Sequence, residues 1–201
     1  EVQQADNKFD EAVATYRQII GIDATQFRAQ LGIAQLELYR GKLETADQAL
    51  QAAEKLAPKA ALVRFARGII EYRRGNLDAA DSAFQSTLLA SPEHIGSLLG
   101  YALTSFGAGR YEETIQKARK VLSSQPDNKL ANQLLADSLL QTGASKEALA
   151  ILEPLLARFP EDARLTASIG QAYLQTKDYN RAMRYFDKAT ELAPDDAAIR
   201  T

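Results

Sequence analysis

Residues 75–92 read GNLDAADSAFQSTLLASP and contain the three marks on which the fold assignment rests. Gly75 precedes a small residue, Ala80, by five positions, and Pro92 follows that small residue by twelve. Glycine suits a tight connection between two helices, and proline ends a helix because it lacks an N–H and crowds the preceding turn. The segment therefore predicts a turn, a helix and a helix stop, in that order.

The same marks recur along the whole chain at one spacing, 34 residues. The small residues are Ala12, Ala46, Ala80, Thr114, Ala148 and Ala182. The turn positions are held by Gly41, Gly75, Gly109 and Gly143, with Asn7 and Lys177 in the corresponding places at the two ends. The stop positions are held by Pro58, Pro92, Pro126, Pro160 and Pro194, with Ala24 in the first. A fixed period of this length predicts a repeat array.

Apolar residues between these marks fall at helical spacing, as in Leu43, Ala46 and Leu50. Each unit is therefore predicted to be helix, turn, helix. A second set of small residues lies seven positions before the turn, where paired helices should approach closely: Ala34, Gly68, Ala102, Ala136 and Gly170. One hairpin does not bury its apolar face alone, so neighbouring units should stack. Pro154 lies inside a second helix and should bend or interrupt it.

This pattern resembles the tetratricopeptide repeat (TPR) family, whose unit carries small residues in both helices and a proline near its end. The resemblance implies an all-α fold, a right-handed α-solenoid of TPR helix-turn-helix repeats. Thr114, Ala118 and Lys177 depart from the family pattern without breaking the period. We expect a partial repeat, five full repeats and the start of a further helix, at 1–26, 27–60, 61–94, 95–128, 129–162, 163–196 and 197–201. Neither end has a polar capping unit, so we expect a segment of a longer repeat protein.

Three short segments carry a closer resemblance: LLADSLL at 134–140, AILEPLL at 150–156 and GQAYL at 170–174. They are similar to long bacterial repeat lipoproteins encoded with exopolysaccharide and PEP-CTERM protein-sorting systems. This resemblance implies a periplasmic or cell-envelope location and a scaffold role in polysaccharide or protein export.

Composition limits the partners. Lys plus Arg number 24 and Asp plus Glu 26, a net charge of −2, which argues against nucleic acid as a partner. There is no cysteine, so neither a disulfide nor a thiolate metal site is possible. No apolar run approaches the roughly 18 residues of a membrane span, and residues 1–5 lack a signal-peptide pattern.

Residues that could perform chemistry are few. His94 is the sole histidine, which is too few for a catalytic triad or a histidine metal site. Asp137 projects to the inner face but stands alone, whereas glycosidases need a second carboxyl group within about 10 Å. We therefore predict a protein that is not an enzyme and needs no cofactor or metal. A second hypothesis places an enzyme domain elsewhere in a longer parent chain.

The family resemblance implies that the first helices of successive hairpins line a concave groove in which a peptide or partner protein binds. Helical projection selects the groove residues Phe65, Ile69, Tyr72, Leu99, Leu103, Phe106, Gln133 and Asp137. The inward row also includes Arg28, Leu31, Gln35 and Tyr39 before them and Gln141, Arg164, Gln171 and Gln175 after them. The row is aromatic and aliphatic in its first half and amide-rich in its second. Phe65, Tyr72 and Phe106 are the predicted anchors, while Leu99 and Leu103 are explained equally well by packing.

An alternative function depends on charge. The helix predicted to contain Phe65 also carries Arg64, Arg67 and Arg73, a possible anion patch for an acidic peptide or an acidic polysaccharide of the cell envelope. The competing explanation is that these side chains cover apolar surface and pair with neighbouring carboxylates such as Glu71.

Overall fold

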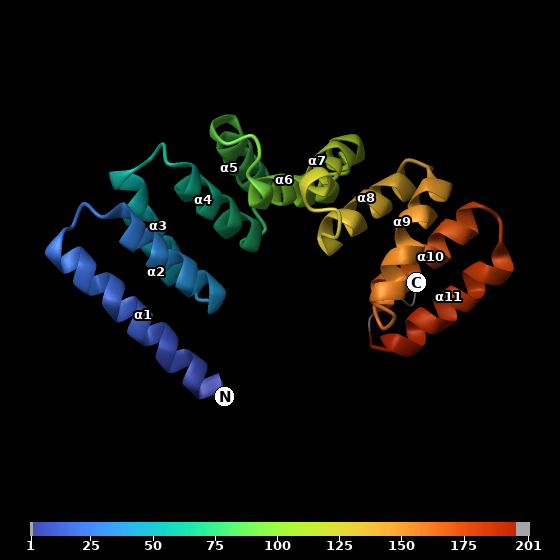
Figure 1. Cartoon of the computed structure of the whole chain (residues 1–201), viewed down its shortest axis with the longest axis horizontal. Helices are drawn as coiled ribbons and strands as arrows, with labels where there is room; N and C mark the ends of the chain where they lie inside the picture. Colours follow the sequence, from blue (N-terminus) through green and yellow to red (C-terminus); the bar gives the residue numbers. More distant parts are fainter. Residues whose placement is uncertain (1, 196–201) are drawn as a thin grey trace. The chain divides into compact units, whose positions relative to one another are not determined.

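A computed structural model describes the backbone of residues 2–195 and the side chains of residues 8–195. All of its regular structure within that range is helical, with no strand (Figure 1). The helices are α1 Val2–Ile22, α2 Phe27–Tyr39, α3 Leu43–Leu56, α4 Ala61–Arg73, α5 Leu77–Ala90, α6 Ile95–Gly107, α7 Tyr111–Ser124, α8 Lys129–Gln141, α9 Ser145–Arg158, α10 Ala163–Gln175 and α11 Tyr179–Leu192. The all-α solenoid of helical hairpins expected from the sequence is confirmed.

The predicted punctuation lies where the helices end. First helices such as α2 have 13 residues and second helices such as α3 have 14, and each second helix of a full repeat stops two residues before its proline. The four turn glycines have φ between 73° and 82°. This left-handed backbone carries no steric penalty at glycine. Lys177 adopts the same conformation with φ of 63°, so it substitutes for the fifth glycine at the cost of that penalty.

One expectation was wrong. Helix α1 runs without a break from Val2 to Ile22, so Asn7 does not form a turn. Asparagine bears a Cβ and favours the left-handed conformation less than glycine does, and the helical hydrogen bonds continue through it. Pro154 does not interrupt α9, because Leu152 and Leu155 on either side are buried in the core and hold both flanking turns. A bend at Pro154 stays a prediction. The further helix expected at 197–201 lies outside the described residues.

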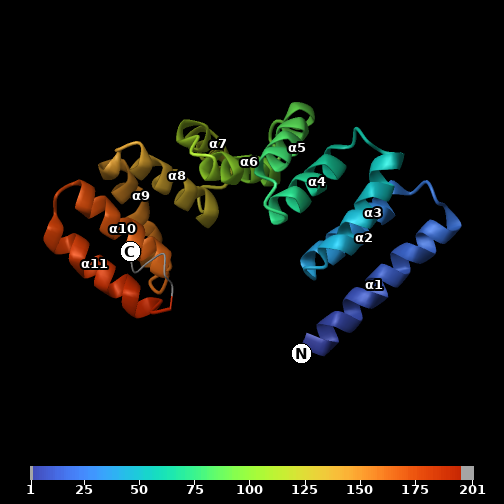
Figure 2. The same ribbon diagram turned by 180° about the vertical axis from the view of Figure 1, so that it is seen from behind.

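The chain divides into two compact units, Glu1–Thr104 and Ser105–Thr201, and the division falls within α6. In the first unit, α1 to α5 pack in chain order, each against the next, and α2 also contacts α4. In the second unit, α7 to α11 pack in the same way, and α8 also contacts α10 (Figures 1 and 2). First helices therefore touch first helices within each unit, as the stacking argument predicts.

Close helix approach depends on matched side-chain volumes. The ring of Phe84 lies where a Cβ on Gly68 would come within 2.5 Å, and Gly170 faces Phe186 in the same way at 2.9 Å. Where the second helix instead carries leucine, at Leu50 and Leu152, the first helix carries alanine, at Ala34 and Ala136. Small residues seven positions before the turn are thus required by the size of the residue opposite.

The small residues after each turn are buried: Ala46, Ala80, Thr114, Ala148 and Ala182 are at most 2% exposed. This burial confirms the predicted register. Within the described part of the chain, no helix is long and apolar enough to cross a membrane.

Candidate functional site

The groove residues of the first unit lie on α4 and α6, and the structure exposes them to different degrees. Tyr72 is 39% exposed, whereas Phe65, Ile69, Leu99 and Leu103 are half-buried. Ile69 packs against two core clusters of the unit, so part of its apolar surface serves the fold. The row is therefore a partly covered apolar strip in this unit.

Phe65 is held on three sides by its own unit. Its ring centroid lies 4.6 Å from that of His94, edge to face, and 6.0 Å from that of Phe84. A Cβ on Gly96 would come within 2.6 Å of the ring, so Gly96 makes room for it. The side chain closes the contact between α4 and α6, which is a packing role that the sequence-based assignment as an anchor did not anticipate.

His94 is used in the same contact. Its Nδ1 accepts a hydrogen bond from the backbone N–H of Ser97 at 3.1 Å and lies 2.9 Å from Ser97 Oγ. Burial lowers its pKa, so the neutral ring is favoured. No group of three or more histidine, cysteine or carboxylate side chains in the described range could hold a metal ion.

Two exposed tyrosines lie at one end of the first helices. Arg73 Nη1 donates to the carbonyl oxygen of Leu38 at 2.5 Å, which brings the C-terminal ends of α2 and α4 together. The residues adjacent to these two, Tyr39 and Tyr72, are 78% and 39% exposed. The ring of Tyr39 also lies 5.2 Å from that of Phe9 on α1. Tyr39 and Tyr72 are therefore the aromatic side chains of this row that are most available to a partner.

In the second unit the groove residues are mostly polar, and Asp137 is already hydrogen-bonded. Phe106 packs edge to face on Tyr111, with centroids 5.5 Å apart. Asp137 Oδ1 accepts a hydrogen bond from Ser168 Oγ at 2.8 Å, and burial raises its pKa above the ordinary range. Gln133 is half-buried. The Asp137 carboxyl group bridges α8 and α10 through that hydrogen bond.

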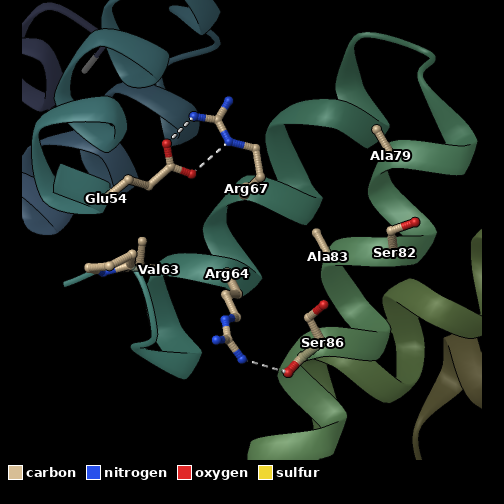
Figure 3. A pocket seen from close by; sticks show the side chains of 9 residues that line it. Glu54, Val63, Arg64, Arg67, Ala79, Ser82, Ala83 and Ser86 are labelled. Carbon is tan, nitrogen blue, oxygen red and sulfur yellow. Dashed lines mark hydrogen bonds and ion pairs between the residues drawn. The ribbon is translucent and has the colours of Figure 1, made fainter.

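The arginines of α4 do not form a uniform positive patch. Arg67 donates to both carboxylate oxygens of Glu54 at 2.8 and 2.7 Å (Figure 3). It also donates to Asp47 at 2.5 Å. Arg74 Nη2 donates to Asp47 at 2.7 Å and Nη1 to Glu71 at 3.3 Å. These two cations face three carboxylates, so the cluster as a whole is not positive. The competing explanation, internal pairing, is favoured for Arg67.

The carboxylates respond to these cations. Burial would raise the pKa of Asp47, but hydrogen bonds from Arg74 and Arg67 outweigh it and hold the pKa below its usual range. The amide of Asn76, followed by Arg67, lowers the pKa of Glu71. Both groups are therefore charged at neutral pH, and the network is a structural ion cluster between α3 and α4.

Asp47 and Glu54 were missed by the sequence analysis. The signal is visible when equivalent positions of the repeats are compared. Arg67 occupies the position held by Ile33, Tyr101, Leu135 and Ile169 in the other repeats, and Glu54 the position held by Ile20, Leu88, Leu122 and Leu156. Arg67 stands at a position that is otherwise apolar or aromatic, and Glu54 at one that is otherwise apolar except for Thr190, so this contact is unlike the others.

The geometry thus defines a class, a helical-hairpin repeat protein. Sequence profiles of the tetratricopeptide repeat family match residues 31–95 and 65–129, and again residues 105–169 and 146–201. The chain belongs to the tetratricopeptide repeat family.

Individual relatives agree on the repeat. Tetratricopeptide repeat protein 21B of Xenopus laevis is 33% identical over 63 residues, which is 31% of this chain and 5% of that protein. The structure of YrrB, described as a TPR protein with an unusual peptide-binding site, superposes with a TM-score of 0.78 at 17% identity, covering 92% of this chain and 95% of that one. A chain of the APC/C hetero-tetramer Cut9-Hcn1 gives 0.77 at 18% identity over 96% of this chain and 39% of the other. At these identities the structures establish the shared fold alone.

Proposed function

We propose that the chain is a non-catalytic scaffold that binds a peptide or partner protein along its first helices, in the concave groove typical of its family. The observation that carries the proposal is the pair of exposed tyrosines, Tyr39 and Tyr72, at the joined ends of α2 and α4. Tyrosine is enriched at protein interfaces because it combines a large apolar ring with a hydroxyl group. Ile69, Leu99 and Leu103 would supply partly exposed aliphatic surface next to them.

The packing of Phe65 changes how the proposal is tested. Truncation of Phe65 would open the α4–α6 contact, so a loss of binding in that variant would be ambiguous. Tyr39→Ala and Tyr72→Ala remove exposed rings and leave the core in place. The matched control is Tyr179→Ala, which removes a ring that is 61% exposed on the second helix α11.

The experiment recovers partners from an extract of the source organism on immobilised wild-type and variant protein, with thermal unfolding of each. We expect Tyr39→Ala and Tyr72→Ala each to weaken partner binding by about 2 kcal/mol or more, as loss of an interface tyrosine does, and so to lower the amount of partner recovered. Their unfolding midpoints should be almost unchanged. Tyr179→Ala should retain recovery. Full recovery of partners by both first-helix variants would show that Tyr39 and Tyr72 do not take part in binding.

The setting of this scaffold is also a proposal. The segments at 134–140, 150–156 and 170–174 support a role in bacterial exopolysaccharide or protein export and a periplasmic or cell-envelope location. Fractionation of the source organism with an antibody to this chain tests the location, and recovery in the cytoplasmic fraction would contradict it.

The alternative, direct contact with acidic polysaccharide through Arg64, Arg67 and Arg73, ranks second. Arg67 is occupied by Asp47 and Glu54, and Arg73 by the carbonyl oxygen of Leu38. Salt titration separates the two functions, because polyanion binding through arginines weakens steeply with ionic strength, whereas apolar groove binding does not.

A further inference from the structure

A pocket of about 480 Å³ opens between α3, α4 and α5 in the first unit (Figure 3). Its lining combines small or apolar side chains with two arginines and two serines: Glu54, Pro58, Val63, Arg64, Arg67, Ala79, Ser82, Ala83 and Ser86. At 100° per residue, Val63, Arg64 and Arg67 project from the face of α4 opposite to Phe65, Ile69 and Tyr72. The pocket is therefore separate from the proposed groove.

Small residues create this space, and the later repeats carry longer side chains at the same positions. Ala83 occupies the position that Lys117, Ile151 and Tyr185 hold in later repeats. Ala79 likewise replaces Glu113, Glu147 and Arg181. Alanine at both positions, one turn apart on α5, leaves open a volume that longer side chains would occupy in the later repeats, whereas the preceding repeat has Thr45 and Ala49 there.

Arg64 brings an uncommitted cation to this space. Its Nη1 donates to the carbonyl oxygen of Ser86 at 3.2 Å, and it has no ion pair with any carboxylate in residues 8–195. A guanidinium carries five N–H donors, so most of those of Arg64 are available. The equivalent residues in the other repeats, Gln30, Leu98, Asn132 and Thr166, are uncharged. By contrast, Arg67 is satisfied by Glu54 and Asp47 at the far edge of the pocket.

We propose that this pocket binds a glutamate side chain of an acidic peptide segment. The carboxylate pairs with Arg64 and accepts a hydrogen bond from Ser86 Oγ. The methylene stem lies on Val63, Ala79 and Ala83. The negative charge of Glu54 does not oppose this ligand strongly, because Arg67 neutralises it with two parallel hydrogen bonds.

A peptide fits this lining better than a sugar. Sugar hydroxyl groups need several hydrogen-bonding partners when they are buried, and no aromatic ring lines the pocket to cover the apolar face of a pyranose. Alanine, valine and proline instead suit an aliphatic stem with one charged tip.

The test is a titration of ¹⁵N-labelled chain with a short, capped peptide of alternating alanine and glutamate, followed by amide chemical shifts. The same peptide with glutamine in place of glutamate is the ligand control. We expect the glutamate peptide to shift the amides of Arg64, Ala83 and Ser86, and the glutamine peptide to bind about tenfold more weakly or worse, because a charge-assisted bond is lost.

Two variants and a charge control make the result specific. Arg64→Gln should weaken binding about tenfold. Ala83→Ile should abolish it by filling the pocket, and the fold should persist because Ile151 occupies the equivalent position. Lys59→Gln removes one positive charge beside Pro58 from an exposed residue that does not line the pocket, and it should change affinity by less than about twofold.

Three results would overturn the proposal. The first is no saturating shift up to about 1 mM peptide. The second is an equal loss in Arg64→Gln and Lys59→Gln, which would indicate diffuse electrostatic attraction. The third is unchanged binding by a folded Ala83→Ile variant.

Discussion

The α3–α4 contact and the α9–α10 contact occupy equivalent places in the repeat but differ in chemistry. Asp47 and Arg67 are bonded to each other at the first, where Asp47 is only 8% exposed. The equivalent residues at the second, three repeats further along the chain, are Leu149 and Ile169. Ile169 is fully buried, and Leu149 packs against the same apolar cluster. One backbone geometry thus accepts either an ion cluster or an apolar seam.

Stability alone does not explain why the α3–α4 contact is charged. Removing charges from water offsets most of what an ion pair gains, so replacing a buried pair by apolar residues of similar size is often neutral or stabilising. The charged contact is therefore not explained by a need for stability. Its position along one edge of the Arg64 pocket, where Arg67 and Glu54 line the wall, agrees with the binding role proposed for that pocket.

The largest expected effect comes from placing a lone charge in the apolar seam. Ile169→Arg should lower the free energy of unfolding by about 4 kcal/mol, because a fully buried guanidinium would have no partner there. Urea unfolding measures it, with Leu174→Arg, at a site 46% exposed on the same helix, as the control. A loss below about 1 kcal/mol would mean that the seam admits solvent and that the two contacts are alike.

Breaking the ion cluster should have the next largest effect. Arg67→Met leaves the carboxylates of Asp47 and Glu54 without their shared cation, and we expect a loss of about 3 kcal/mol in urea unfolding. Arg64→Met, which removes an arginine without an ion pair from the same helix, should cost less than about 1 kcal/mol. Equal losses in the two variants would show that side-chain packing, not charge, sets the effect.

Acid should weaken the charged contact selectively. The pKa of Asp47 is lower in the folded chain than in the unfolded chain, so the unfolded state takes up a proton first as the pH falls. The stability that Asp47 contributes is complete above about pH 4 and is lost as the pH falls through the folded-state pKa. Urea midpoints at several pH values should fall more steeply for wild type than for a variant with the apolar seam at α3–α4, Asp47→Leu/Glu54→Leu/Arg67→Ile. Parallel curves would contradict this assignment.

The fold was predictable from the sequence because most helix boundaries carry a local signal. Gly41, Gly75, Gly109 and Gly143 supply the left-handed turns, and the prolines follow the helix ends. The turn predicted at Asn7 was wrong. Asn7 lies at the turn position of the 34-residue period, but its preference for the left-handed backbone is too weak to end the helix.

The candidate site was predictable only in part. Periodicity correctly placed Tyr72 on an exposed face, but the burial of Phe65 depends on His94, which lies in a connection between repeats outside the helical pattern. The pairing of Arg67 depends on which carboxylates α3 brings within reach, and that is a property of the packed hairpins. Arg67 is nonetheless the one charged residue at a repeat position that is otherwise apolar or aromatic. This difference was visible in the sequence and would have located the ion cluster between α3 and α4.

The central claim is that the charges of Asp47, Glu54 and Arg67 between α3 and α4 are dispensable for folding. Urea unfolding of Asp47→Leu/Glu54→Leu/Arg67→Ile at neutral pH tests it most directly. The account predicts a free energy of unfolding equal to that of wild type or higher by about 1 kcal/mol, because the three residues reproduce the seam of α9–α10. A loss of more than about 2 kcal/mol would contradict it and would make the ion cluster a requirement of the fold.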